Sequence, residues 1–183
     1  MNKVDLSIFK NPPQVGAGKF KIILWYFTNV LFLKNGWNPS STIKKNLLKL
    51  FGSKVGKGVI IKPGVNIKYP WKLKIGDYVW IGENVWIDNI ADITLGSNVC
   101  LSQGCMLMCG NHNYKRKDFP TIASPIIVED GAWIGAKSLV TGGVTVHTHA
   151  ILSVMSVASQ SLEAYGIYRG NPAVKIKTRT IDV

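Results

Sequence analysis

Acidic residues are scarce in this chain of 183 residues, which holds 10 Asp and Glu against 22 Lys and Arg. The net charge of +12 is uneven, because residues 1–52 contain eight lysines and one acid. Such a basic segment can meet an anionic membrane surface or an anionic substrate, or it can be a solvated helix face. No nucleic-acid-binding module is recognisable, so we expect no nucleic acid partner.

Cysteine is also rare. The three cysteines, Cys100, Cys105 and Cys109, form no CxxC pair, and their odd number argues against a disulfide framework. We therefore expect buried thiols in a reducing compartment. Together with the lack of a recognisable cleavable signal peptide, this predicts a cytoplasmic protein, with peripheral contact to the inner face of the membrane as an option.

Long hydrophobic runs are missing as well. The longest apolar stretch, residues 22–33, includes Thr28 and Asn29 and falls short of the roughly 20 residues that span a bilayer. It predicts a buried or interfacial helix. A second helix is expected over residues 41–51, capped by Ser40 or Ser41 and stopped by Gly52. Its apolar stripe consists of Ile43, Leu47, Leu48 and Leu50.

The dominant pattern in the remaining chain is an aliphatic residue that returns every six positions. Neither a strand period of 2 nor a helix period of 3.6 produces this spacing. Six-residue repeats are typical of a parallel β-helix, in which three hexads make one coil. In each hexad the aliphatic residue and the small residue two places before it should point inward. The aliphatic series is Ile75, Ile81 and Ile87, then, after a two-residue insertion, Leu95, Leu101 and Leu107. After a break it resumes as Val128, Ile134, Val140, Val146 and Leu152, ending on Ala158.

These patterns divide the chain into three parts. Residues 1–52 are expected to form a basic helical arm or cap, and residues 53–163 an all-β solenoid with a looped-out insertion at 108–125. Residues 164–183 are expected to be a tail that caps the other end, because the exposed ends of a solenoid need covering.

The insertion carries His112 at its base. Insertions of this kind often form the binding face of a solenoid. A histidine is suited to take a proton from a hydroxyl or an amine. The alternative is a surface histidine in a polar turn.

Several motifs together resemble the hexapeptide-repeat acyltransferases. They are the hexads, the run from Gly110 to Tyr114, the run from Asp130 to Ala136, and Gly170-Asn171-Pro172-Ala173. Within that family the chain is most similar to the colanic acid biosynthesis acetyltransferases. The resemblance implies a left-handed β-helix, a homotrimer, and acetyl-CoA as co-substrate in the groove between neighbouring subunits, with no metal.

The resemblance also implies roles for single residues. His112 would be the general base on the acceptor hydroxyl, and Asn89 would orient the acceptor. The Ala136 N–H would face the thioester oxygen. Trp133 would lie along the pantetheine arm, or else pack plainly at a coil corner. The remaining cofactor-binding residues would be Gly135, Val154, Ser159 and Lys175.

The C-terminal coils depart from the family pattern. Gln160 stands where a lysine near the CoA phosphates is common, Val174 replaces an expected basic residue, and Val154 narrows the groove. Lys175, Lys177 or Arg179 can replace the missing cation, since a flexible side chain reaches phosphate from a neighbouring position. If CoA binding is lost, the protein would instead be a non-catalytic trimeric scaffold.

His147 and His149 replace the usual residues of a turn. Two histidines two positions apart suggest a zinc site shared with His112. The histidine spacing typical of zinc-binding solenoids is absent, so we expect exposed turn histidines instead.

The function predicted from the sequence is O-acetyl transfer to a sugar hydroxyl in exopolysaccharide or capsule synthesis. The acceptor would be a sugar, a nucleotide sugar or a lipid-linked saccharide.

Overall fold

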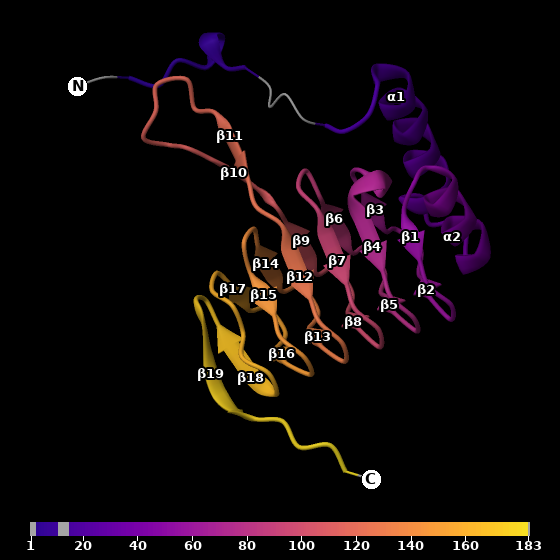
Figure 1. Cartoon of the computed structure of the whole chain (residues 1–183), viewed down its shortest axis with the longest axis vertical. Helices are drawn as coiled ribbons and strands as arrows, with labels where there is room; N and C mark the ends of the chain where they lie inside the picture. The colour runs from indigo at the N-terminus through magenta and orange to yellow at the C-terminus, as the bar shows by residue number, and fades with distance from the viewer. Residues whose placement is uncertain (1–2, 11–14, 183) are drawn as a thin grey trace.

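Each hexad folds into a short strand that pairs in parallel with the strand one coil away. Ile61, Ile81 and Leu101 lie in register on one face at steps of 20 residues. Ile134 and Leu152 lie in register at the 18-residue step. The computed structural model, which describes residues 3–10 and 15–182, is therefore a β-solenoid of about six turns with helices at its N-terminal end (Figure 1).

The coils stack into three faces. The first face contains β1 (Lys54–Val55), β4 (Leu73–Ile75), β7 (Ile93–Leu95), β12 (Ile126–Val128) and β15 (Thr145–Val146). The second contains β2 (Ile60–Ile61), β5 (Trp80–Ile81), β8 (Cys100–Leu101), β13 (Trp133–Ile134), β16 (Ile151–Leu152), β18 (Gly166–Gly170) and β19 (Ala173–Thr178). The third contains β3 (Asn66–Ile67), β6 (Trp86–Asp88), β9 (Met106–Met108), β14 (Leu139–Thr141) and β17 (Val157–Ala158).

The core is the stack of inward positions that the repeat predicts. All twelve residues of the aliphatic series are buried, and so are the small residues two places before them, such as Val79, Val85 and Ala132. Cys105 and Cys109 are buried in the same core, as expected, while Cys100 is half-buried in β8. Because every coil repeats the same inward positions, apolar burial is continuous along the stack.

Two helices cover the N-terminal end of the stack. Helix α1 (Lys19–Thr28) runs into a π-helical turn, η2 (Asn29–Leu33), and α2 (Ser41–Leu50) follows. Ser40 caps α2 by accepting a hydrogen bond from the Ile43 N–H, and Gly52 beyond it has a φ of 106°, which confirms both expected signals. Two short 3₁₀ turns, η1 (Leu6–Ile8) and η3 (Pro70–Lys72), complete the helical elements of the described residues.

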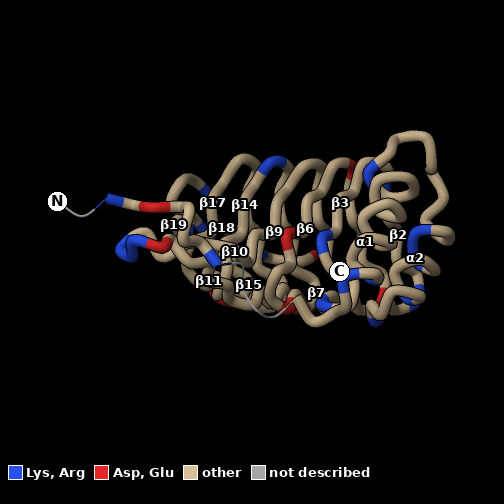
Figure 2. Tube along the Cα trace, turned by 90° about the horizontal axis from the view of Figure 1, so that it is seen from above, with Lys and Arg blue, Asp and Glu red and all other residues tan. Residues whose placement is uncertain are grey.

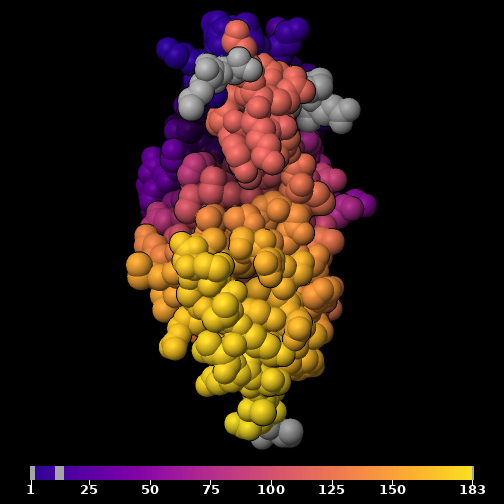
Figure 3. All heavy atoms as spheres, turned by 90° about the vertical axis from the view of Figure 1, so that its left-hand side faces the viewer, coloured from indigo at the N-terminus to yellow at the C-terminus, as the bar shows by residue number. Residues whose placement is uncertain are grey.

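The insertion is more ordered than a loop. Its two ends form an antiparallel hairpin of β10 (Gly110–His112) and β11 (Thr121–Ala123), with His112 opposite Thr121. The hairpin projects from the stack beyond β9 (Figure 1). In Figure 3 it lies against the N-terminal residues, consistent with the Asp5 N–H, which donates to the Lys117 carbonyl at 2.9 Å.

The C-terminal boundary also differs from the expectation. The parallel ladder continues past residue 163, because β18 pairs with β16 at Ile151↔Ile167 and Leu152↔Tyr168. Only β19 behaves as a cap, turning back antiparallel onto β18. Leu152 and Tyr168 are 16 residues apart, so the final coil breaks the hexad spacing that the sequence pattern relied on.

Candidate functional site

His112 stands at the end of β10, where the hairpin leaves the solenoid. Its imidazole stacks on the Phe119 ring, with centroids 4.5 Å apart and planes inclined by 10°. Phe9 from the N-terminal segment approaches from another side, at 6.0 Å between ring centroids. These aromatic contacts hold the imidazole plane in one orientation.

One hydrogen bond selects the tautomer of His112. Its Nδ1 lies 3.0 Å from the Phe119 carbonyl oxygen. A carbonyl only accepts, so Nδ1 carries the proton and donates it. In the neutral imidazole Nε2 then has a free lone pair, which is the form that a general base requires.

A groove of about 440 Å³ lies beside His112. The hairpin contributes one wall, and the third face and the segment before η3 contribute the other. The groove is lined by Val15, Lys68, Tyr69, Asp88, Ile90, Met108, Gly110, Asn111, His112 and Thr121. It therefore places a base, a carboxylate and a cation around one concave surface.

The charged pair in this groove is Lys68 and Asp88. Their Nζ and Oδ1 atoms are 2.8 Å apart, and only 7% of Asp88 is exposed. The contact lacks hydrogen-bond geometry at Oδ1. That oxygen is buried, and the Lys68 ammonium offsets its charge, while Asp88 as a residue still lines the groove.

Asn89, the residue predicted to orient an acceptor, occupies a different place. Its side chain is fully buried, and its Oδ1 accepts from the Tyr69 N–H at 2.9 Å. Its Nδ2 donates to the Tyr69 carbonyl at 2.6 Å. Asn89 therefore holds the Tyr69 backbone at the groove wall, and its neighbour Asp88 is the residue that faces the groove.

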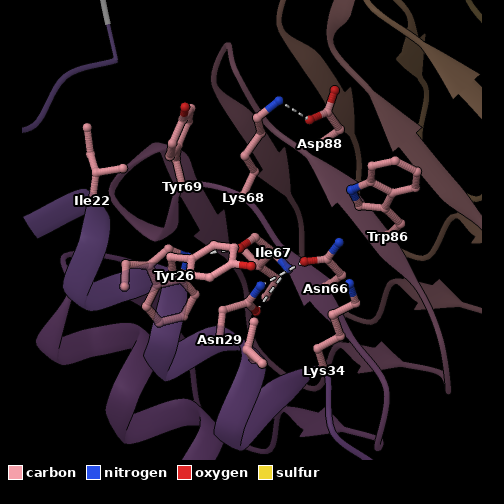
Figure 4. Close-up of a pocket in the computed structure, with 12 residues that line it drawn as sticks. Ile22, Tyr26, Asn29, Lys34, Asn66, Ile67, Lys68, Tyr69, Trp86 and Asp88 are labelled. Carbon is pink, nitrogen blue, oxygen red and sulfur yellow. Dashed lines mark hydrogen bonds and ion pairs between the residues drawn. The ribbon is translucent and has the colours of Figure 1, made fainter. Parts of the chain in front are cut away.

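A second pocket, of about 300 Å³, adjoins the first and shares Lys68, Tyr69 and Asp88 with it. Figure 4 shows it between α1 and the third face, with the Lys68–Asp88 pair at one rim and Tyr26 and Trp86 on opposite sides. The Asn29 Nδ2 donates to the Asn66 Oδ1 at 2.7 Å and closes its floor. Aromatic faces, amides and lysines within one pocket suit a sugar that carries a phosphate.

Four of the residues predicted to bind CoA lie together on another part of the solenoid. Trp133 is half-exposed in β13, and its indole N–H donates to the Ser102 hydroxyl at 2.8 Å. Gly135 follows it and packs closely on the next coil, where a Cβ would come within 2.6 Å of the Val154 nitrogen. Ala136 is adjacent; its carbonyl accepts from the Met155 N–H at 2.9 Å, while its own N–H donates to no other described residue.

The remaining two cofactor candidates are spread more widely. Lys175 lies on β19 and pairs with Glu163 at 2.7 Å, which raises the pKa of the lysine. Ser159 follows β17 on the third face. Val154, the fourth residue of the group around Trp133, is exposed, and so is Met155 beside it. Within the described residues of one chain, none of the six cofactor candidates lines the groove beside His112.

The three histidines do not converge. The His147 Nδ1 lies 3.1 Å from Glu129, whereas His149 sits at a coil corner with a φ of 59° and stacks on Tyr165 at 4.9 Å. The described part of the chain contains no group of three or more His, Cys, Asp or Glu residues that could hold a metal ion.

Sequence reasoning missed the charged pair of the groove, Lys68 and Asp88, and also Phe119, which contacts His112 from outside the groove lining. Lys68 and Asp88 were detectable, because strands 20 residues apart pair in register and the alternation places both on the same side of adjacent strands. Phe119 carried no such signal. Its contact with His112 depends on the hairpin turn, where Phe119 adopts a φ of 44°.

Comparison with known proteins identifies the family. No protein-family model matches the chain. The chain is 36% identical over 178 residues to the putative colanic acid biosynthesis acetyltransferase WcaF of Escherichia coli (strain K12), covering 96% of this chain and 97% of that protein.

Two solved structures share the fold. The hexapeptide-repeat-containing acetyltransferase VCA0836 of Vibrio cholerae O1 biovar eltor, complexed with acetyl coenzyme A, superposes with a TM-score of 0.77 at 25% identity, covering 94% of this chain and 96% of that one. A galactoside acetyltransferase in complex with coenzyme A superposes with a TM-score of 0.75 at 22% identity, covering 87% and 80%. The identity to WcaF over nearly the full length of both chains, together with the six-turn solenoid, shows that the chain belongs to the hexapeptide-repeat acetyltransferases.

Proposed function

We propose that the protein transfers an acetyl group from acetyl-CoA to a sugar hydroxyl during exopolysaccharide or capsule synthesis. The observation that carries this proposal is the hydrogen bond from the His112 Nδ1 to the Phe119 carbonyl, because it leaves Nε2 available as a base inside a groove. The similarity to WcaF supports the acetyl donor and the polysaccharide context.

In the proposed reaction, the acceptor hydroxyl gives its proton to the His112 Nε2 while its oxygen attacks the thioester carbonyl carbon. The tetrahedral intermediate carries the negative charge on the former carbonyl oxygen. Its collapse breaks the carbon–sulfur bond and forms the ester. The departing thiolate takes the proton from the imidazolium, which returns His112 to its starting state. No covalent enzyme intermediate is needed.

The Ala136 N–H is the proposed donor to the oxyanion. It makes no hydrogen bond to another described residue, so it is available to a ligand. A single lost donor of this kind costs roughly 3 kcal/mol in the transition state. Ala136 and His112 lie on different parts of one chain, which supports a homotrimer in which the hairpin of one subunit faces the second face of its neighbour.

We place the acceptor in the groove beside His112 and in the pocket that continues from it toward α1. Asp88 would accept from a sugar hydroxyl, and Lys68 and Lys34 at the rim of the pocket would meet a phosphate. This arrangement favours a nucleotide sugar or a lipid-linked saccharide over an uncharged sugar.

The acceptor class is tested by measuring thiol release from acetyl-CoA with matched sugars, sugar phosphates and nucleotide sugars. We expect phosphate-bearing acceptors to have the lower KM, and Lys34→Gln to raise that KM without changing the KM for acetyl-CoA. Equal KM values for charged and uncharged acceptors would contradict this placement.

A scaffold without catalysis is the second candidate. Two observations favour it. Val154 and Met155 are exposed where the CoA groove is predicted, and Lys175, a candidate cation for the CoA phosphates, is already paired with Glu163. Isothermal titration with CoA separates the two functions. If wild type releases or absorbs heat on binding CoA and Trp133→Ala binds more weakly, the result supports the enzyme. If wild type shows no heat at millimolar CoA, the result supports the scaffold.

A further inference from the structure

Helix α1 and the turn η2 carry an apolar stripe on the side that faces away from the solenoid. Phe20 is 81% exposed, Ile23 56%, Leu24 48%, Phe27 57% and Leu31 51%. Steps of three and four residues place these five side chains on one helical face. The opposite face is the one that packs, since Trp25, Asn29 and Leu33 are buried.

The inner face is fixed to the first coil by specific contacts. The Trp25 indole N–H donates to the Ile67 carbonyl at 2.9 Å, and the Trp25 ring packs against Phe51 at 5.0 Å. The Asn29 amide bonds to Asn66. The outer stripe is thus held on a fixed support, so exposure of its apolar side chains is a property of the folded protein.

The surroundings of the stripe are strongly basic. Residues 6–76 contain 13 lysines and no Asp or Glu. Lys19 begins α1 and Lys34 follows η2, and α2, which contacts η2, carries Lys45 and Lys49. Figure 2 shows lysines in blue on α2 at this end of the stack. An apolar helix face surrounded by positive charge suits a surface that is negatively charged outside and apolar inside, as an anionic lipid bilayer is.

The stripe is too short to cross such a surface. Together α1 and η2 contain 15 residues (10 and five), or about 22 Å of helix, against the roughly 30 Å of a hydrocarbon core. No helix among residues 3–10 and 15–182 has the length and apolar character to span a membrane. A helix with these properties lies in the interface plane.

Trp37 supports this geometry. It is exposed beside the end of η2, and its indole N–H donates to the Leu31 carbonyl at 2.8 Å. Tryptophan favours the boundary between lipid headgroups and acyl chains, where its apolar ring and polar N–H are both accommodated. A second copy that meets this face through its own copy of the same face is a poorer occupant, because two lysine-rich surfaces repel each other.

We propose that the outer face of α1 and η2, formed by Phe20, Ile23, Leu24, Phe27 and Leu31 with Trp37 at its end, docks on an anionic membrane. The same helix forms a wall of the pocket shared with the His112 groove, through Ile22 and Tyr26. Docking therefore brings the mouth of the acceptor pocket to the lipid surface, where a lipid-linked saccharide presents its phosphate.

The test is flotation of the full chain with vesicles of equimolar phosphatidylglycerol and phosphatidylcholine, or of phosphatidylcholine alone. The docking variant is Phe20→Ser/Phe27→Ser. The matched control is Ile176→Ser/Ile181→Ser, which removes two exposed apolar side chains from the C-terminal region. We expect wild type and control to float with the anionic vesicles at low salt. The docking variant should bind at least about tenfold more weakly.

Three results would overturn the proposal: no flotation of wild type on anionic vesicles, equal flotation of the docking variant, or equal binding to neutral vesicles. A larger assembly for wild type than for the docking variant in gel filtration would assign the face to a second copy instead. Turnover with a water-soluble acceptor is measured in parallel and does not depend on membrane docking. Absence of this turnover would therefore count against the proposed acetyl transfer and not against docking.

Discussion

Phe119 controls His112 in two ways, because the imidazole stacks on its ring at 4.5 Å and donates from Nδ1 to its carbonyl at 3.0 Å. Ring and carbonyl come from one residue, so a single backbone conformation fixes both the plane and the tautomer of the base. That conformation has a φ of 44°, in the left-handed region that disfavours most side chains. Phe119 is therefore a positioning residue.

The substitution Phe119→Ala tests this role. Removing the ring should lower kcat about tenfold or more while leaving the KM for acetyl-CoA unchanged, because orientation of the base is lost and donor binding is not. Phe119→Gly is the matched variant, since glycine adopts this φ freely. It should be about 0.5–1 kcal/mol more stable than Phe119→Ala in urea unfolding. Equal stability of the two variants, or wild-type kcat in both, would contradict the role.

Adjacent residues Asp88 and Asn89 should give opposite phenotypes. Asn89→Ala removes both hydrogen bonds to the Tyr69 backbone and should cost about 1–3 kcal/mol of unfolding free energy. Asp88→Asn keeps the shape and should change the unfolding free energy by less than about 1 kcal/mol, because its partner Lys68 is partly exposed. It should instead raise the KM for the acceptor. Thermal unfolding and acceptor titrations on both variants measure these two effects. A strongly destabilised Asp88→Asn with an unchanged acceptor KM, or an Asn89→Ala as stable as wild type, would contradict the two roles.

The buried cysteines should be unreactive in the folded protein. Burial raises the pKa of Cys105 to about 12 and that of Cys109 to about 11. At pH 8 the thiolate fractions are then about one in 10⁴ and one in 10³. Brief iodoacetamide treatment followed by peptide mapping should leave both unmodified, with complete modification after denaturation. Rapid labelling of Cys105 in the native protein would show that the core opens.

Lys44 is a buried lysine outside the site. Its Nζ donates to the Ile61 carbonyl at 3.2 Å, and burial, followed by the charge of Lys62, lowers its pKa from 10.5. The Ser41 hydroxyl donates to the same carbonyl, so Lys44→Met leaves no orphaned acceptor. We expect this variant to be more stable at pH 7, by on the order of 1 kcal/mol.

The pH dependence of that difference gives an independent check. A lowered pKa means that the unfolded state binds the proton more readily, so wild-type stability from this group rises as pH rises toward 10.5. The advantage of Lys44→Met should therefore shrink between pH 7 and pH 10. A constant or growing advantage would show that packing, and not charge burial, causes it.

The sequence predicted the solenoid because an aliphatic residue returns at six-residue steps in two runs, from Ile75 to Leu107 with one two-residue insertion and from Val128 to Ala158. It also located His112, because an interruption of the repeat is conspicuous. It did not show how the two polar residues after Ile87 are placed, because only the structure shows that Asp88 lines the groove and that Asn89 is buried and bonded to the Tyr69 backbone. The hairpin and β18 escaped prediction, because their pairing depends on contacts between segments that lack the six-residue pattern.

The central claim is that His112 is the base of an acyl transfer. The most direct measurement is thiol release from acetyl-CoA with a phosphate-bearing sugar acceptor, comparing wild type, His112→Ala and the control His147→Ala. The His147 side chain is exposed and its only hydrogen-bond or ion-pair partner among the described residues is Glu129, so its loss should leave turnover near that of wild type. His112→Ala should lower kcat by about 10²–10⁴-fold, with CoA binding and the oligomeric state unchanged. Wild-type turnover in His112→Ala would contradict the account.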